Sequence, residues 1–202
     1  MKLGSSNVLG IALADRTIAV AQVGGKSDAG QGSQAAIFTL PADVSIDKPE
    51  AVGNALAGFL KQKGFSASRV VVGVPAKWLM AVEKDVPPAS KEQMRSMLRL
   101  QAERLSLADS GEVVFDFAGE HQANRPGNVL LVAMLKKQLD RVTQIAEAAG
   151  LTIVAVTPTT LALASVSARA NKAASDRPMV VLAGHGAEIV WQRQGMPRML
   201  RH

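Results

Sequence analysis

The chain has 202 residues, of which 48% are hydrophobic and 20% charged, so it holds enough apolar side chain for one large core or two smaller ones. It has no cysteine, which excludes disulfides, thiolate zinc sites and cysteine catalysis and fits a reducing compartment. The net charge of +6 does not by itself indicate a nucleic-acid binder, because only 3% of the residues are aromatic and base stacking needs aromatic side chains.

No stretch of the sequence approaches the roughly 18 uninterrupted apolar residues that a membrane-spanning helix needs. The longest apolar run, residues 128–135, has the length of a strand. The N-terminal segment, residues 1–16, has one lysine and a short, interrupted apolar part without a convincing cleavage site, which favours a strand over a signal peptide. We therefore expect a soluble protein of the cytoplasm.

The N-terminal part of the chain predicts an antiparallel meander of three strands, then a helix, then a central strand. Alternating apolar residues and a tight turn at 14–16 indicate the meander. Helical spacing of apolar residues ahead of Gly64 indicates the helix, and the continuous apolar run RVVVGV indicates a strand buried on both faces. The expected ranges are 7–13, 17–23 and 34–40 for the meander, 48–63 for the helix and 69–74 for the central strand.

The middle of the chain, residues 76–156, predicts a small inserted subdomain of β-α-β-β-α-β order. Ser90 and Gln93 form a capping box at the start of its first helix. The apolar face of that helix is expected to hold Met94, Met97, Leu98, Ala102 and Leu105, and its polar face Arg95, Arg99, Glu103 and Arg104. The expected ranges are 79–86, 90–105, 112–117, 128–135, 136–149 and 151–156.

The last part of the chain predicts a helix and the beginning of a further domain. Thr157-Pro158 opens a helix that runs to about Asn171, because proline is common in the first helical turn. A linker follows at 173–177, and two strands at 178–184 and 187–193 pair across a turn before a final strand.

Few residues suggest chemistry. The three histidines, His121, His185 and His202, lack the spacing of a metal site, and no GxSxG nucleophile elbow is present. The glycine-rich stretch 24–32 has no GKS or GKT and is interpreted as a hairpin loop rather than a P-loop. Asp15 and Glu188 follow strand ends and are candidate acids or metal-holding groups, although a single carboxylate in a turn is usually a turn former. We expect no catalytic residue and no metal site.

The order of the elements, together with four segments, carries a resemblance to a known fold. The segments are 8–23, 69–105, 112–117 (EVVFDF) and 129–164, the last beginning VLLVAM and containing EAAGL. The order of the elements resembles the actin-like (ribonuclease H-like) ATPase fold, an α/β fold: a hairpin, a third strand, a helix, a central strand, an inserted subdomain and a second hairpin. The position of the inserted subdomain in the chain resembles that in FtsA. Within that superfamily the segments are similar to PilM, to the cytoplasmic part of GspL and to MshI-type proteins.

The resemblance implies three parts. Residues 1–75 and 157–172 would form the first actin-like subdomain, residues 76–156 the FtsA-type α+β insert, and residues 173–202 the start of a truncated second lobe.

The two hairpins that cradle phosphates in actin-like ATPases depart from the family pattern, in which each begins with D-I-G. Ala12 stands in place of the first Asp and Ala14 in place of the Gly, and Leu182 replaces the second Asp. Loss of both carboxylates removes the charge that holds the metal, so we expect no ATP hydrolysis and no bound cofactor. The degenerate phosphate loops comprise Ala12, Ala14, Asp15, Leu182, Gly184 and Gly186.

The resemblance implies a non-enzymatic scaffold of a type IV pilus or type II secretion assembly platform, located in the cytoplasm at the inner membrane. Its partners would be the cytoplasmic tail of a PilN-like or GspM-like membrane protein, which binds between the insert and the first subdomain, and the motor ATPase. Arg99, Glu103 and Arg104 are the candidate partner-binding residues, with simple solvation of the helix as the alternative. A homodimer is left open, and no nucleic acid is expected.

Two other functions stay open. The surviving Gly184 and Gly186 support an ATP-binding conformational switch of the same machinery. The basic residues Lys136, Lys137, Arg198 and Arg201, although scattered in the sequence, motivate a module that contacts anionic lipid or nucleic acid, which would bind with a steep salt dependence.

Overall fold

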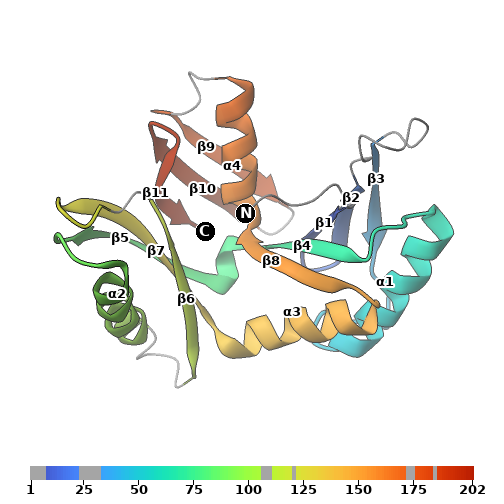
Figure 1. Cartoon of the computed structure of the whole chain (residues 1–202). Coiled ribbons are helices and arrows are strands. Elements are labelled where there is room, and N and C mark those ends of the chain that lie inside the picture. The colour runs from blue at the N-terminus through green and yellow to red at the C-terminus, as the bar shows by residue number, and fades with distance from the viewer. Residues whose placement is uncertain (1–7, 23–32, 106–110, 120–121, 172–175, 184–185) are drawn as a thin grey trace. The chain divides into compact units, whose positions relative to one another are not determined.

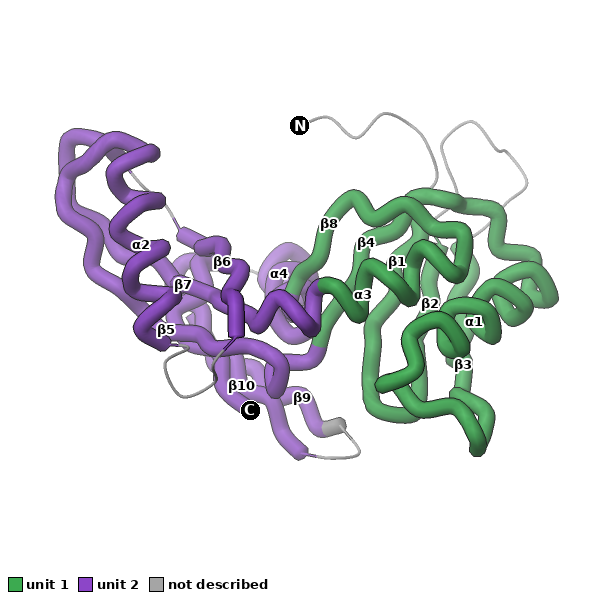
Figure 2. Tube along the Cα trace, turned by 90° about the horizontal axis from the view of Figure 1, so that it is seen from below, with its two compact units in different colours: residues 1–74, 140–157 green, residues 75–139, 158–202 purple. Residues whose placement is uncertain are grey.

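The computed structural model of the chain describes residues 8–22, 33–105, 111–119, 122–171, 176–183 and 186–202 (Figure 1). The chain forms two compact units, coloured separately in Figure 2. Unit 1 consists of Met1–Val74 and Asp140–Thr157, and unit 2 of Pro75–Leu139 and Pro158–His202. Each unit therefore combines segments that lie far apart in the sequence.

Unit 1 is built on a five-stranded sheet of order β3-β2-β1-β4-β8. Strands β1, β2 and β3 form the antiparallel meander that the sequence predicts, and β1 also pairs in parallel with β4. Because β1 and β4 have neighbours on both sides, their alternate side chains are fully buried, Leu9 and Val70 among them. The strands are β1 (Val8–Leu13), β2 (Thr17–Gln22), β3 (Gln34–Thr39), β4 (Arg69–Val74) and β8 (Thr152–Pro158).

Helices α1 (Pro49–Lys63) and α3 (Lys136–Ala148) supply the rest of the unit 1 core. Helix α1 packs on the sheet through Phe59, whose ring centroid lies 5.1 Å from that of Phe38. It ends where predicted, at Gly64, which adopts a left-handed φ of 76° that favours glycine. Helix α1 contacts α3 at Gly53, where a Cβ atom would lie 2.5 Å from the Cβ atom of Ala148.

The first half of unit 2 is a three-stranded antiparallel sheet of order β5-β7-β6 covered by α2. Buried Met94, Leu98 and Ala102 of the helix share a core with Val129 and Ala133 of the sheet. The predicted capping box is confirmed, because Ser90 N–H donates to Gln93 Oε1 at 2.9 Å and Gln93 N–H to Ser90 Oγ at 3.2 Å. The elements are β5 (Leu79–Val86), α2 (Lys91–Leu105), β6 (Val113–Ala118) and β7 (Gly127–Leu135), preceded by the short 3₁₀ helix η1 (Ala76–Trp78).

The second half of unit 2 is a three-stranded antiparallel sheet of order β11-β10-β9 with helix α4. Val190 and Leu200 of this sheet share one core with Ala164 of α4 and Leu130 of β7, so the two halves of the unit are packed together. The elements are α4 (Thr159–Ala170), β9 (Pro178–Ala183), β10 (Gly186–Arg193) and β11 (Met196–Arg201).

The structure groups several segments differently from the subdomain boundaries that the sequence predicts. Helix α3 from Asp140 onward, expected in the insert, belongs to unit 1, and strands β9, β10 and β11, expected in a separate lobe, share unit 2 with the insert. The strand expected in the insert at 151–156 is β8, which lies beside β4 in unit 1, and Thr152 N–H donates to the carbonyl of Ser68 at 2.8 Å. The helix expected in the first subdomain is α4, which begins at Thr159 and belongs to unit 2, where the Gln192 side chain donates to the carbonyl of Ala164 at 3.1 Å. Periodicity predicts each element correctly, but it does not specify the element against which it packs.

Within the described residues, no helix is both long enough and apolar enough to cross a lipid bilayer.

Candidate functional site

The first degenerate hairpin, β1–β2, is a tight turn tied to the loop that follows β3. Ala14 N–H donates to the carbonyl of Thr17 at 2.9 Å and closes the turn. The Arg16 guanidinium donates to the carbonyls of Leu40, Pro41 and Val44 at 3.0–3.1 Å. The sequence gives no signal of this role of Arg16, because every residue has a backbone carbonyl and its acceptors therefore cannot be recognised by residue type.

The positions that the resemblance assigns to phosphate and metal binding in this hairpin carry methyl groups. Ala12 is half-buried in β1, and Ala14 is exposed in the turn. Asp15, the first acidic residue after them, is half-buried beside Arg16. A methyl group at position 14 occupies the space through which a glycine would let the backbone approach a phosphate.

The second degenerate hairpin, β9–β10, belongs to unit 2. Leu182 is 82% exposed and presents an isobutyl group to solvent where the family pattern has a carboxylate. Gly186 has a φ of 152°, a backbone conformation that favours glycine, and a Cβ atom there would lie 3.1 Å from Nε2 of the exposed His202 side chain. Gly184 and His185 lie outside the described residues.

Glu188, a candidate acid in the sequence, is buried in unit 2 and holds three elements together. Its carboxylate accepts a hydrogen bond from Ala76 N–H at 2.7 Å and another from the Thr160 hydroxyl. These donors come from η1 and α4, and Glu188 itself lies on β10. The described residues contain no group of three or more His, Asp or Glu side chains that could hold a metal ion. The contacts of Glu188 are structural.

The outer surface of α2 carries the three predicted partner-binding residues. Arg99, Glu103 and Arg104 are all exposed, as expected for a polar face. Met97, which the sequence places on the buried face, is instead 40% exposed. Leu100, which the prediction omits, is 59% exposed.

The helical repeat explains this arrangement. At 100° per residue, Met97, Leu100 and Arg104 lie on one flank of α2, while Arg99 and Glu103 lie on the other. Met97 lies at the edge of the buried stripe rather than within it. A helical wheel drawn from the sequence could have predicted the exposure of both Met97 and Leu100. The exposed surface of α2 therefore combines apolar side chains with charges of both signs.

Contacts at the start of α2 hold this helix in place. Hydrogen bonds from the backbone N–H of Glu92 and from the Ser90 hydroxyl lower the pKa of the Glu92 carboxyl below its ordinary value. The Arg95 guanidinium lies 5.6 Å from the centroid of the Phe115 ring and 3.7 Å from the Asp116 carboxylate. Together with the buried Met94, Leu98 and Ala102, the Arg95 contacts connect α2 to the sheet.

The basic residues that motivate an anion-binding module do not form one surface. Lys136 lies 4.0 Å from the Glu112 carboxylate, and Arg198 lies 3.2 Å from that of Glu83. Arg201 donates to the carbonyl of Ala81 at 2.6 Å. Of the residues in this group, Lys137 at the start of α3 and Arg201 are exposed. Most of the charge is therefore used in contacts within the chain.

No protein-family model and no curated protein sequence matches the chain. Among solved structures, it matches a chain of the PilM–PilN type IV pilus biogenesis complex with a TM-score of 0.80 and 20% identity, over 96% of this chain and 60% of the other. It thus spans about three fifths of the length of that chain.

Two further structures extend the comparison. The cytoplasmic domain of EpsL, an inner-membrane component of the type II secretion system of Vibrio cholerae, gives a TM-score of 0.59 at 16% identity, over 96% of this chain and 70% of EpsL. A Bacteroides thetaiotaomicron protein with an actin-like ATPase fold and unknown function gives a TM-score of 0.52 at 11% identity, over 97% of this chain and 69% of the other. The predicted fold class is therefore confirmed: the chain has the actin-like ATPase fold, in the form found in the PilM–PilN complex and the EpsL cytoplasmic domain.

Proposed function

We propose that the chain is a non-enzymatic scaffold of a type IV pilus or type II secretion assembly platform. In this role it binds the cytoplasmic tail of an inner-membrane partner, PilN-like or GspM-like, and links that partner to the motor ATPase from the cytoplasmic side of the membrane. The observation that carries the proposal is the similarity of fold, over 96% of the chain, to a protein of the PilM–PilN complex.

The described geometry supports a scaffold more than an ATP-driven switch. Neither position 12 nor position 182 carries a carboxylate, so the metal-binding charge of an ATPase is missing from both hairpins. The exposed Met97 and Leu100 on α2 give a peptide an apolar contact, and the neighbouring Arg104 and Glu103 give it polar ones. Binding of this kind needs a shaped surface and no chemical step.

The proposal is tested with two fluorescent synthetic peptides, one that copies the cytoplasmic tail of a PilN-like protein and one that copies the cytoplasmic tail of a GspM-like protein. We expect saturable binding in fluorescence anisotropy. Leu100→Glu and Glu103→Lys should each weaken the affinity about tenfold or more, because they change an exposed contact without touching the core.

Asp43→Lys is the matched control for Glu103→Lys, since it reverses the charge of another exposed carboxylate, outside α2. Absence of binding to both a PilN-like and a GspM-like tail would contradict the proposed function. Binding that Leu100→Glu and Glu103→Lys leave unchanged would remove α2 from the binding site while preserving the function.

A further inference from the structure

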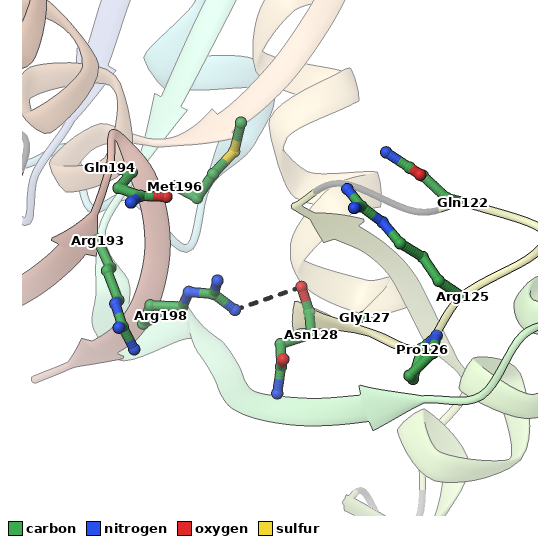
Figure 3. A pocket seen from close by; sticks show the side chains of 9 residues that line it. All are labelled: Gln122, Arg125, Pro126, Gly127, Asn128, Arg193, Gln194, Met196 and Arg198. Atoms are coloured by element: carbon green, nitrogen blue, oxygen red, sulfur yellow. Dashed lines mark hydrogen bonds between the residues drawn. The ribbon is translucent and has the colours of Figure 1, made fainter.

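A polar pocket lies within unit 2, between two tight turns (Figure 3). One turn joins Gln122 to Arg125, which form an isolated antiparallel bridge, and leads into β7. The other joins Arg193 to Met196, the pair at which the β10–β11 hairpin begins. The pocket has a volume of about 330 Å³, and the described residues that line it are Gln122, Arg125, Pro126, Gly127, Asn128, Arg193, Gln194, Met196 and Arg198.

The pocket is positively charged. Three arginines line it, Arg125, Arg193 and Arg198, and no acidic side chain is among its described lining residues. Arg198 is partly neutralised, since it lies 3.2 Å from the Glu83 carboxylate and also donates to the carbonyl of Asn128 at 3.4 Å. The three arginines of the lining therefore face one directly paired carboxylate, and two more carboxylates, Asp85 and Asp176, border the pocket through hydrogen bonds to Asn128 and Gln194.

The other two arginines of the lining, Arg125 and Arg193, do not take part in holding the fold together. Within the described part of the chain, the Arg125 and Arg193 guanidinium groups make no hydrogen bond or ion pair to another side chain or carbonyl. They face the pocket from different turns, and in Figure 3 the Arg125 side chain lies next to Gln122, across from Arg198. Their N–H donors are therefore available to a ligand.

The turn that carries Arg193 is conformationally fixed. Gln194 and Gly195 have φ values of 53° and 75°, the left-handed pair that a two-residue hairpin turn requires. Gln194 N–H donates to the Asp176 carboxylate at 2.8 Å, and Arg198 joins β11 to β5 and β7. A site whose walls are already ordered loses little entropy when it binds a ligand.

We propose that this pocket binds a small oxyanion ligand with at least two negative charges. Guanidinium groups bind carboxylate and phosphate in the same forked geometry, so polycarboxylates and phosphate compounds share the required chemistry. The volume is at the lower limit for small-molecule sites, about 300 Å³, and the lining is polar where most such sites are apolar, which favours a compact, highly charged ligand. This proposal does not depend on the proposed function.

The test is isothermal titration calorimetry of the full chain with pyrophosphate and, separately, with citrate, at about 50 mM salt, where charge screening is moderate. We expect one-to-one binding of at least one probe. Arg125→Ala and Arg193→Ala should each weaken that binding about tenfold, because each removes a charge-assisted contact. Arg193→Lys should fall between Arg193→Ala and the unchanged chain, since it keeps the charge but loses the fork.

The matched control is Arg169→Ala, which removes an exposed arginine of α4 in the same unit but outside the pocket. Binding of pyrophosphate alone would identify a phosphate site, and binding of citrate alone a carboxylate site. Absence of binding to both probes would overturn the proposal. So would equal weakening by Arg169→Ala, because that would indicate diffuse attraction to a chain of net charge +6. Arg125 and Arg193 lie on separate turns, so a folding defect in one variant leaves the other as a test.

Discussion

At the scale of single residues, the structure gives the carboxylate of Glu188 a role that the sequence leaves open. The sequence shows an acidic residue near a strand end, which fits either an acid catalyst or a structural group. In the structure its side chain is buried and accepts hydrogen bonds from Ala76 N–H and the Thr160 hydroxyl. Both donors would otherwise be buried without a partner, which is costly. Glu188 therefore stabilises the junction of η1, β10 and α4.

We expect Glu188→Ala to lower the free energy of unfolding of the chain by roughly 1–3 kcal/mol for each donor left without an acceptor. Glu188→Gln should cost less, because its amide oxygen still accepts one hydrogen bond. Urea titration followed by circular dichroism measures both changes. A Glu188→Ala variant as stable as the unchanged chain would show that the hydrogen bonds of Glu188 contribute nothing measurable.

At the scale of elements, α1 contains two glycines with opposite roles. Gly58 has open space around it, so its lack of a side chain serves no packing purpose. Gly53 lies against α3, where a Cβ atom would meet both the Cβ atom of Ala148 and the carbonyl of Ile145 at 2.5 Å. The close approach of the two helices depends on the absence of that one atom.

Gly58→Ala should therefore stabilise the chain by up to about 1 kcal/mol, because alanine is the better helix former. Gly53→Ala should destabilise it by roughly 1–3 kcal/mol, since overpacking forces α1 away from α3 and exceeds the gain in helix propensity. Thermal unfolding of the two variants measures the difference in their stability. The same substitution is made in both, at two positions of one helix. A Gly53→Ala variant as stable as Gly58→Ala would mean that the contact relaxes without cost.

At the scale of the whole molecule, the degenerate phosphate hairpins are distributed between the two units. The β1–β2 hairpin belongs to unit 1 and the β9–β10 hairpin to unit 2. An actin-like ATPase requires an acidic residue in each, and this chain has Ala12 in one and Leu182 in the other. If the resemblance assigns these positions correctly, the chain has the fold of an ATPase without the carboxylates that would hold its metal.

We expect titration calorimetry with Mg-ATP to give no micromolar affinity and a phosphate-release assay to give no saturable hydrolysis. A catalytically active actin-like ATPase, run in parallel, is the positive control. Binding that persists in EDTA and is lost in Arg193→Ala would belong to the arginine pocket rather than to the hairpins. Micromolar, Mg-dependent binding with hydrolysis would refute the expectation.

The sequence by itself determined the elements and the chemistry that is missing. Periodicity and capping signals located the helices and strands, as the capping box at Ser90 and the terminus at Gly64 demonstrate, because these signals act over a few neighbouring residues. Ala12 and Leu182, which the resemblance places where the family pattern has acidic residues, are likewise evident in the sequence.

Only the tertiary structure decided which elements pack together. It placed β8 beside β4 and α4 against β10, and buried Glu188 between two donors. It also brought two turns about 70 residues apart together into the arginine pocket. These arrangements depend on contacts between distant segments, and a local pattern of apolar and polar residues does not specify the partner of each face.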